Sequence, residues 1–322
     1  MTKDLVSVII PVYNRENVIE ECLNSVFAQS YQNFEIIIVD DGSSDGTYKI
    51  CERLAAKDER IKLFAAKHGG VSAARNLALE KSDGEYVFFI DSDDVIYPLL
   101  LETLVDGMKN TGAQIGGTNV VGVAEKNWQK VCERLAEVTE RAEIAFNTHE
   151  ETLEAVFCQK SPLGCIGGVM IRSDLIGDTR FMTDLFIGED FYFIYENLIK
   201  NASSVFLDKK WYYVRYHKTN SSWNYNYDGF LTRFRRRELV WKSEESFGRT
   251  KYANIQKRDA FSCYTTCFRK NDSSSSDVKK MIKTMKEDRS ELLPAFSLKQ
   301  KVIYFLYVYF PSIARLLFKA KS

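Results

Sequence analysis

Short apolar runs alternate with segments of helical periodicity along roughly the first ninety residues. Val6–Ile10, Phe34–Val39 and Tyr86–Ile90 are almost wholly apolar, as is typical of strands buried on both faces. Between them apolar residues recur at intervals of three and four, which indicates amphipathic helices at 15–30, from about Thr47 to Lys57 and from about Ser72 to Lys81. A further short strand is expected at Ile61–Ala65. The alternation predicts an α/β fold in which helices cover both faces of a mostly parallel sheet.

Polar or glycine-rich segments follow the predicted strands along this stretch. They are Pro11–Asn14, Asp40–Asp41, Lys67–Gly70 and Asp91–Asp94. In open parallel sheets, ligands bind outside the carboxyl ends of the strands. The four segments are therefore expected to converge on one crevice that is large enough for a nucleotide.

The last of these segments is acidic, because an apolar strand runs directly into Asp91-Ser92-Asp93-Asp94. Clustered carboxylates repel one another unless a cation is near. Mg²⁺ and Mn²⁺ suit such a cluster, since one or two protein carboxylates hold them while substrate phosphates supply other ligands. The alternative is an acidic turn in which Asp93 or Asp94 caps a helix expected over residues 99–108.

Four sequence blocks of the first hundred residues occur in a specific order and spacing. They are V-S-V-I-I-P-V-Y-N at 6–14, I-I-V-D-D-G-S-S-D-G-T at 37–47, G-G-V-S-A-A-R-N at 69–76 and F-I-D-S-D-D at 89–94. Together they resemble the family 2 glycosyltransferases, inverting enzymes of the GT-A fold. The resemblance implies a Rossmann-like sheet and a nucleotide-diphosphate sugar, a UDP-sugar in particular, as the donor.

In enzymes of this kind the residue matching Asp41 accepts hydrogen bonds from the base, while Pro11, Tyr13 and Asn14 line the base and ribose. The chemistry is suitable, because a carboxylate accepts the imide N–H of uracil and an aromatic ring covers an apolar face. The alternative for Asp41 is an Asx-turn residue that introduces Gly42.

The resemblance also makes Asp93 the direct metal ligand and places Asp91 near the ribose or the metal, with Asp94 as a cap or support. Arg75 follows Gly69-Gly70 in the first turns of a helix, where a guanidinium meets phosphate oxygens or orders the crevice. A plain ion pair is its alternative role. The predicted donor-binding set is Pro11, Tyr13, Asn14, Asp40, Asp41, Lys67, Gly70, Arg75, Asp91, Ser92 and Asp93.

The segment Phe186–Phe191 contains Glu189-Asp190 and is similar to the family's E-D motif. An inverting transfer needs a carboxylate that takes the proton of the acceptor hydroxyl. Asp190 is the predicted base, with Glu189 beside it as the second catalytic residue. Otherwise the two acids simply favour the amino end of a helix beginning near Asp190.

Two further features match the family less specifically. Gly164–Gly168 resembles the loop that approaches the donor sugar, and its alternative is a flexible turn before a strand at Val169–Ile171. His217 stands where related catalytic domains carry a late histidine. As a metal ligand it would suit Mn²⁺ better than Mg²⁺, and its alternative is a structural hydrogen bond.

We expect residues 1–217 to form the GT-A catalytic domain, with 1–98 as the nucleotide-sugar-binding half and 99–217 as the acceptor-side half. Residues 218–322 are expected to form a helical extension, because 230–247 and 252–270 show helical spacing. Within it, Val302–Phe310 is apolar or aromatic but far shorter than the roughly 20 residues that span a bilayer. Basic residues flank it at Lys299, Lys301, Arg315, Lys319 and Lys321.

This composition suits a peripheral membrane contact through residues 301–322, with a buried helix or a dimer contact as alternatives. The 44 basic and 44 acidic residues balance, so no global field points to nucleic acid. The seven cysteines form no disulfide or zinc pattern, and residues 1–4 lead directly into a strand. A cytoplasmic location without a secretory signal is expected, at the inner membrane face if the membrane contact exists.

The function predicted first is that of a hexosyltransferase dependent on Mn²⁺ or Mg²⁺ that inverts the donor sugar. The acceptor would be a hydroxyl of a glycan or lipid-linked glycan in surface-polysaccharide assembly, such as capsule. One alternative is an inactive nucleotide-sugar-binding scaffold at the membrane, although Asp91, Asp93, Glu189 and Asp190 are all present. A nucleotidyltransferase is disfavoured, because Val6–Asn14 lacks a glycine- and arginine-rich phosphate loop.

Overall fold

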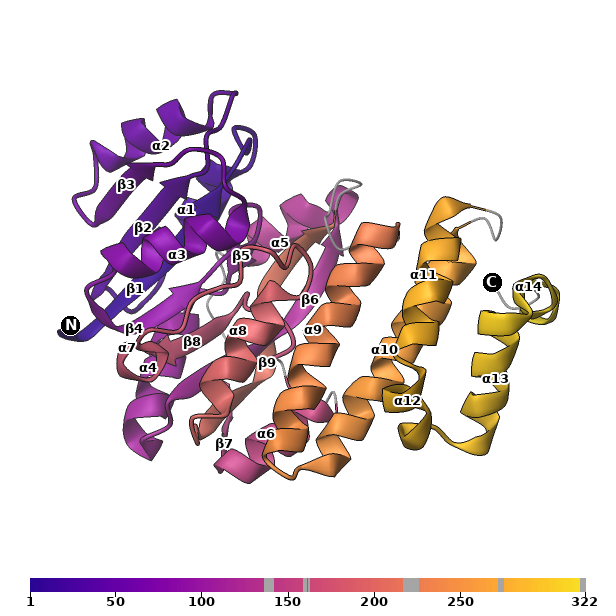
Figure 1. The fold of residues 1–322 in the computed structure, drawn as a ribbon. Coiled ribbons are helices and arrows are strands. Elements are labelled where there is room, and N and C mark those ends of the chain that lie inside the picture. The colour runs from indigo at the N-terminus through magenta and orange to yellow at the C-terminus, as the bar shows by residue number, and fades with distance from the viewer. Residues whose placement is uncertain (136–141, 159–160, 162, 217–225, 272–274, 319–322) are drawn as a thin grey trace. The chain divides into compact units, whose positions relative to one another are not determined.

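A nine-stranded sheet carries the first two thirds of the chain, in the order β3-β2-β1-β4-β8-β6-β9-β5, with β7 paired to β9. The computed structural model describes residues 1–135, 142–158, 161, 163–216, 226–271 and 275–318 (Figure 1). The strands are β1 (Thr2–Val12), β2 (Phe34–Asp40), β3 (Ile61–Ala65), β4 (Gly84–Phe89), β5 (Val95–Ile96), β6 (Ile115–Ala124), β7 (Ile144–Asn147), β8 (Val169–Arg172) and β9 (Ser204–Tyr216).

The helices predicted among the first strands begin and end close to the expected positions. The sheet is accompanied by α1 (Ile19–Phe27), α2 (Thr47–Ala55), α3 (Val71–Lys81), α4 (Leu100–Thr111), α5 (Trp128–Leu135), α6 (His149–Phe157), α7 (Ser173–Ile176) and α8 (Glu189–Leu198). The chain divides into two units, a sheet unit of residues 1–184 and 189–218 and a helical unit of residues 185–188 and 219–322.

One half of the sheet is parallel, as predicted. β1 pairs in parallel with β2 and β4, and β2 pairs in parallel with β3. The register places Pro11 opposite Val39 and Val12 opposite Asp40. Because these strands run in one direction, their carboxyl ends lie at the same edge of the sheet, which brings the predicted polar segments together.

The other half mixes strand directions, which the apolar runs alone do not specify. β8 is antiparallel to both β4 and β6, whereas β6 and β9 are parallel. The short β5 pairs antiparallel with the end of β9, through Val95 with Tyr213 and Ile96 with Tyr212. β9 therefore returns to the chain segment that directly follows the acidic residues.

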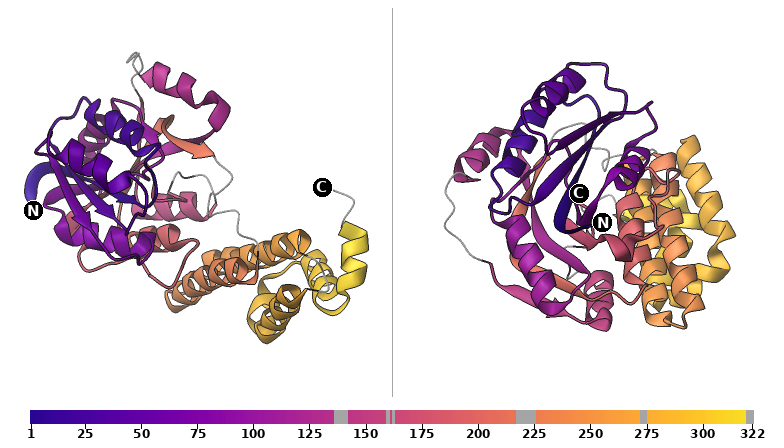
Figure 2. Two further views of the ribbon diagram at one scale, coloured as in Figure 1. Left: turned by 90° about the horizontal axis from the view of Figure 1, so that it is seen from above. Right: turned by 90° about the vertical axis from the view of Figure 1, so that its left-hand side faces the viewer.

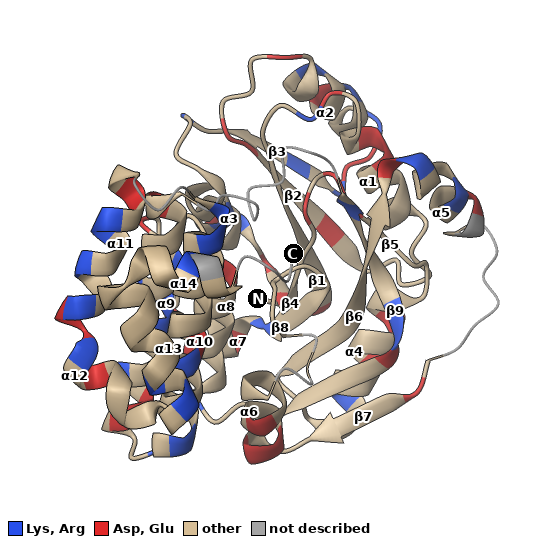
Figure 3. Cartoon of the chain, turned by 90° about the vertical axis from the view of Figure 1, so that its right-hand side faces the viewer, with Lys and Arg blue, Asp and Glu red and all other residues tan. Residues whose placement is uncertain are grey.

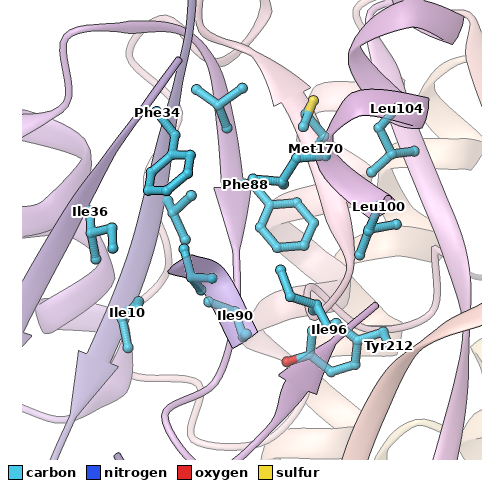
Figure 4. Packing of buried hydrophobic residues seen from close by; sticks show 14 of the residues in the cluster. Ile10, Phe34, Ile36, Phe88, Ile90, Ile96, Leu100, Leu104, Met170 and Tyr212 are labelled. Carbon is cyan, nitrogen blue, oxygen red and sulfur yellow. The ribbon is translucent and has the colours of Figure 1, made fainter. Parts of the chain in front are cut away.

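Alternate residues of β1 lie on opposite faces of the sheet. Val8 and Ile10 belong to a buried cluster with residues of α1, α2 and α4, and Figure 4 shows Ile10 among Phe88, Ile90 and Leu100. On the other face α3 contacts β1 and β2, and Phe193 of α8 meets Phe89 of β4 edge to face. Helices thus cover both faces (Figure 2), and each fully buried side chain of this size contributes about 1.5–3 kcal/mol.

The helical unit is built from α9 (Tyr227–Ser246), α10 (Thr250–Lys270), α11 (Ser276–Glu287), α12 (Arg289–Leu292), α13 (Leu298–Tyr309) and α14 (Pro311–Phe318). Its core is largely aromatic and includes Trp241, Tyr264 and Tyr304. Side-chain caps begin several helices; Ser297, for example, forms a capping box with Gln300 before α13. Among the described residues, no helix combines the length and apolar character that crossing a membrane requires.

Candidate active site

Asp41 organises the loop between β3 and α3. Its buried carboxylate accepts the Gly69 N–H at Oδ1 (2.7 Å) and the Gly70 N–H at Oδ2 (2.9 Å). The His68 Nδ1 lies 2.9 Å from the same Oδ2. Gly70 has φ +87°, a conformation that L side chains rarely adopt, so glycine is required there. Each carboxylate oxygen has two lone pairs, so Asp41 retains capacity to accept a further donor.

Asp40 is buried beside α2, the helix that follows its loop. Its Oδ2 accepts the Ser43 N–H (3.0 Å), and its Oδ1 is buried without a hydrogen-bond partner in the described part of the chain. Burial, together with the Asp40 charge, raises the pKa of Cys51 in α2 to about 12. Pro11, also in the predicted set, is buried in the sheet opposite Val39.

Tyr13 and His68 form an exposed aromatic pair close to Asp41. Their ring centroids lie 4.4 Å apart with an interplanar angle of 26°. Asn14 has φ +52°, its Oδ1 accepts the Ser44 N–H (2.8 Å), and its N–H donates to Ser43 Oγ (2.9 Å). The segments after β1 and β2 are thereby joined. His68 was not in the predicted donor-binding set, although its position in the 67–70 segment after a strand could have indicated it.

The acidic segment is attached to β9 at two points. The Asp91 N–H donates to Tyr212 Oη (3.0 Å), and Asp94 Oδ1 accepts the Arg215 N–H (3.0 Å). Asp94 is buried, and burial followed by the charges of Asp91 and Asp93 raises its pKa well above the usual range. Asp94 is thus a structural anchor, while Asp91 and Asp93 remain partly exposed.

Two arginines offset the charge of the acidic segment. The buried Arg75 bridges two carboxylates, with Nη2 2.9 Å from Asp91 Oδ1 and Nη1 3.2 Å from Glu189 Oε1. Arg15 Nε lies 3.3 Å from Asp93 Oδ2. The sequence interpretation included Arg75, with an ion pair as one of its roles, but missed Arg15. The only available signal for Arg15 was a cation directly after the Tyr13-Asn14 segment.

Neighbouring groups hold Arg75 in place. Burial alone would lower its pKa, but the charges of Asp91, Glu189 and Asp190 outweigh that effect and raise it. The guanidinium carbon lies 5.2 Å from the centre of the Phe181 ring. Asn76 fixes the backbone of Phe181 by donating to its carbonyl (2.9 Å) and accepting its N–H (2.8 Å). The A-R-N block therefore connects α3 to the segment that precedes α8.

Glu189 and Asp190 begin α8, as predicted, and both acids lie in its first turn. Burial, then the Asp190 charge, raises the pKa of the Glu189 carboxyl to about 7, although Arg75 acts in the opposite direction. Asp190 is half-buried, and its Oδ1 accepts the N–H of Phe191 (2.7 Å). Glu189 is therefore held by the Arg75 guanidinium, whereas the carboxylate of Asp190 is partly accessible to another molecule.

The glycine-bearing loop before β8 packs closely on Tyr212. A Cβ placed at Gly167 would lie 2.7 Å from Tyr212 Cζ, and Gly168 has φ +79°. A Cβ at Gly164 would meet nothing within 4 Å. Burial and the nearby Asp190, Asp91 and Asp94 charges raise the pKa of Cys165 to about 12, so this loop borders the acidic residues.

Asp91 and Asp93 provide the oxygen donors that Mg²⁺ and Mn²⁺ prefer. Within the described ranges, no three His, Cys, Asp or Glu side chains gather in a way that would hold a metal by themselves. His217, the other predicted ligand, lies outside the described residues. In the remainder of the predicted set, Lys67 is exposed and Ser92 is buried. The residues present fit a metal held by two carboxylates together with a substrate phosphate.

The fold and the converging strand ends define a GT-A-like protein, as the sequence predicted. Residues 7–175 match the family model described as glycosyl transferase family 2, which is more than half of the chain. The chain belongs to glycosyl transferase family 2.

Several known proteins are similar to parts of this chain. Glycosyltransferase GlyA of Streptococcus pneumoniae is 31% identical over 223 residues, covering 69% of this chain and 32% of that protein. The putative teichuronic acid biosynthesis glycosyltransferase TuaG of Bacillus subtilis is 48% identical over 93 residues, covering 29% of this chain and 37% of its own length. The chain spans about a third of the length of these curated relatives.

A solved structure resembles the fold over most of the chain. It is S. aureus TarS 1-349 in complex with UDP-GlcNAc, with a TM-score of 0.66 and 22% sequence identity, covering 87% of this chain and 79% of that one. At this identity the likeness concerns the fold alone.

Proposed function

We propose that the chain transfers a sugar from a UDP-sugar to a hydroxyl group of a glycan or lipid-linked glycan, with inversion at the anomeric carbon. The observation that carries the proposal is Arg75, which joins Asp91 of the strand-end crevice to Glu189 beside Asp190. The family membership supports sugar transfer. The similar TarS structure is a complex with UDP-GlcNAc, which supports the donor, and the name of TuaG supports surface-glycan assembly.

The proposed mechanism gives each of these residues a distinct role. Asp41 takes the base N–H while Tyr13 and His68 cover the ring, which orients the nucleotide across the crevice. The acceptor oxygen attacks the anomeric carbon as the bond to the diphosphate breaks on the opposite face. Asp190 takes the acceptor proton, because it is the accessible carboxylate of the pair. Arg75 keeps Asp91 and Glu189 in fixed positions throughout.

A divalent metal, Mn²⁺ or Mg²⁺, would be held by Asp93 and Asp91, and when bound it would neutralise charge on the departing diphosphate. Asp93 would then exchange its Arg15 contact for the metal. Asp94 is buried and accepts the Arg215 N–H, so it would hold the acidic segment in place. His217, which follows β9, is proposed as an additional ligand.

In domain terms, residues 1–217 are the proposed catalytic part, with 1–98 binding the donor and 99–217 facing the acceptor. Residues 218–322 are the proposed helical extension. The spacing of the seven cysteines forms no disulfide or zinc pattern, which supports a reducing, cytoplasmic setting.

Calorimetry of UDP, GDP and TDP, each with and without Mn²⁺, tests the donor site. Native protein is expected to bind UDP more tightly with Mn²⁺, and Asp93→Ala to lose the metal dependence. Asp83→Ala is the matched control, because Asp83 precedes β4 at the opposite end of the strand and pairs with Lys62. Failure of native protein to bind any of the three nucleotides would contradict the proposal.

A catalytically inactive scaffold would bind the nucleotide equally well, so binding alone does not separate the two functions. Release of UDP from a panel of UDP-sugars does separate them. An enzyme releases UDP in a reaction that Asp190→Asn strongly slows, whereas a scaffold gives the same background with either protein.

A further inference from the structure

α13 has two apolar faces. Tyr304, Tyr307 and Val308 are buried against the core of the helical unit. On the other side a row of side chains is spaced by four, three and four residues, so its members share one face of the helix. This row consists of Leu298, Val302, Phe305 and Tyr309, each between 38% and 80% exposed. After Lys301, α13 carries no charged side chain, which is unusual for a helix unless something covers its outer face.

The exposed row continues onto α14 through Phe310, Ile313 and Leu317, spaced by three and four residues and between 48% and 59% exposed. On the inner side Ala314 is buried and the Phe318 ring stacks on Tyr307 at 5.4 Å. We call these seven exposed residues, six on α13 and α14 and Phe310 between the two helices, the apolar strip. Scattered exposed apolar residues are common on proteins, but a contiguous row over two helices marks an interaction surface.

Cations border the apolar strip and contact it. Lys286 Nζ of α11 lies 5.1 Å from the centre of the Tyr309 ring, and Arg289 Cζ of α12 lies 5.2 Å from that of Phe305. Arg289 also donates to Tyr309 Oη (3.5 Å). An open hollow of about 500 Å³ is lined by Lys286, Arg289 and Lys301, with Leu293 and Pro294 among its apolar walls.

Further cations lie along the strip. Lys299 precedes Val302 on α13, and Figure 3 shows the basic residues of α11 and α12 in blue. Arg315 of α14, by contrast, points inward and donates to the Phe268 carbonyl (3.3 Å). Of the nearby acids, Glu287 also lines the hollow and faces Lys283 at 3.8 Å. Three cations and one acid therefore line the hollow, so a net positive charge lies beside the apolar strip.

We propose that the apolar strip and the cations of the hollow form a docking surface for an anionic lipid bilayer. Apolar side chains would enter the acyl boundary while Lys286, Arg289 and Lys301 meet phosphate headgroups, as in interfacial helices. A two-fold dimer through the same face fits less well, because an isologous contact brings this basic surface against the same basic surface of the second copy.

Co-sedimentation of the full chain with vesicles tests this surface. Vesicles of phosphatidylcholine with phosphatidylglycerol are compared with vesicles of phosphatidylcholine alone, at low and moderate salt. Native protein is expected to bind only the anionic vesicles. Replacing the three cations by glutamine should weaken binding about a hundredfold, since each contributes roughly fivefold.

Phe305→Glu should abolish vesicle binding, whereas Phe247→Glu is the matched control. Phe247 is also an exposed phenylalanine of the helical unit, 51% exposed, but it lies after α9, outside the strip. Circular dichroism of each variant establishes that the helices are retained. Loss of binding in Phe305→Glu and in the triple variant, with binding kept in Phe247→Glu, supports the proposal.

Three results would overturn it. One is a folded native chain that binds neither kind of vesicle. Another is vesicle binding that Phe305→Glu and the triple variant leave unchanged. The third is a dimer in sedimentation velocity that Phe305→Glu dissociates while vesicles are not bound, which would assign the strip to a second copy of the chain. None of these measurements depends on sugar transfer.

Discussion

The sheet unit and the helical unit depart from the usual distribution of side chains in opposite directions. At the strand ends of the sheet unit, charged residues such as Asp41, Arg75 and Glu189 are buried. On α13 and α14 of the helical unit, apolar residues such as Val302 and Phe305 are exposed. Both departures cost free energy in the isolated chain, and each coincides with one of the two proposed binding surfaces.

Burial of charge alone does not identify a site. The helical unit also buries Glu244, which forms two hydrogen bonds of 2.7 Å with Arg249. That pair joins the end of α9 to the residue before α10, so both partners belong to one turn of the chain. Arg75 differs, because its two acids come from separate segments and one of them, Asp91, is partly exposed.

The largest effect is expected for Asp190→Asn. Removing the proposed base should lower turnover about 10²- to 10⁴-fold while UDP binding is kept, because the amide preserves the shape of the side chain. UDP release and calorimetry measure the two quantities. Asp178→Asn, at an exposed aspartate between α7 and α8, should leave both unchanged. Equal loss of binding and turnover in Asp190→Asn would assign the residue to structure.

Arg75→Met should reduce the free energy of unfolding by about 3–5 kcal/mol, because it leaves two partly or fully buried carboxylates without their cation. Arg249→Met tests the comparison directly, since it breaks a buried pair in the helical unit. Urea denaturation should show destabilisation in both variants. Only Arg75→Met should weaken UDP binding. If Arg249→Met weakened it equally, the Arg75 contacts could not be distinguished from a purely structural ion pair.

A smaller effect is expected from the titration of Glu189. Its pKa is raised to about 7, so the folded state binds more protons than the unfolded state between pH 4.5 and 7. This contribution to stability is present at low pH and is lost as the pH rises through 7. Between pH 5 and 7.5 the unfolding free energy should fall by about 1–3 kcal/mol more in native protein than in Glu189→Gln. If the unfolding free energies of native protein and of Glu189→Gln changed equally with pH, the prediction would be wrong.

The smallest effect on stability is expected from Phe305→Glu. This side chain is 39% exposed and its ring contacts Arg289, so its replacement should lower the unfolding free energy by about 1 kcal/mol. Thermal denaturation checks this value. A loss similar to that of Arg75→Met would show that the apolar strip is part of the core, which would remove the contrast between the two units.

The sequence predicted the elements better than their pairing. The strand at 61–65 has the predicted bounds, and α8 begins at the predicted acids, because apolar periodicity and helix-start signals are local. The mixed directions of β6, β8 and β9 were not predicted, since strand direction depends on how distant segments meet.

The same limit applies to the candidate site. The motif residues of the strand ends could be named from the sequence, and β1, β2 and β4 do place them at one edge. The contacts of Arg15 with Asp93 and of Tyr212 with Asp91 could not be predicted from the sequence, because nothing near these residues in the chain indicates the partner. The catalytic and metal-binding roles of the named residues stay predictions.

The attachment of the acidic segment to β9 has a consequence for synthesis of the chain. Asp91 and Asp94 each bond a residue 121 positions later, Tyr212 and Arg215. At about 5–20 residues per second, a ribosome needs roughly 6–24 s to add that stretch. Closing so long a loop is also slow in itself. The acidic motif is thus encoded in the first third of the chain but is among the last parts of the sheet unit to be completed as the protein emerges.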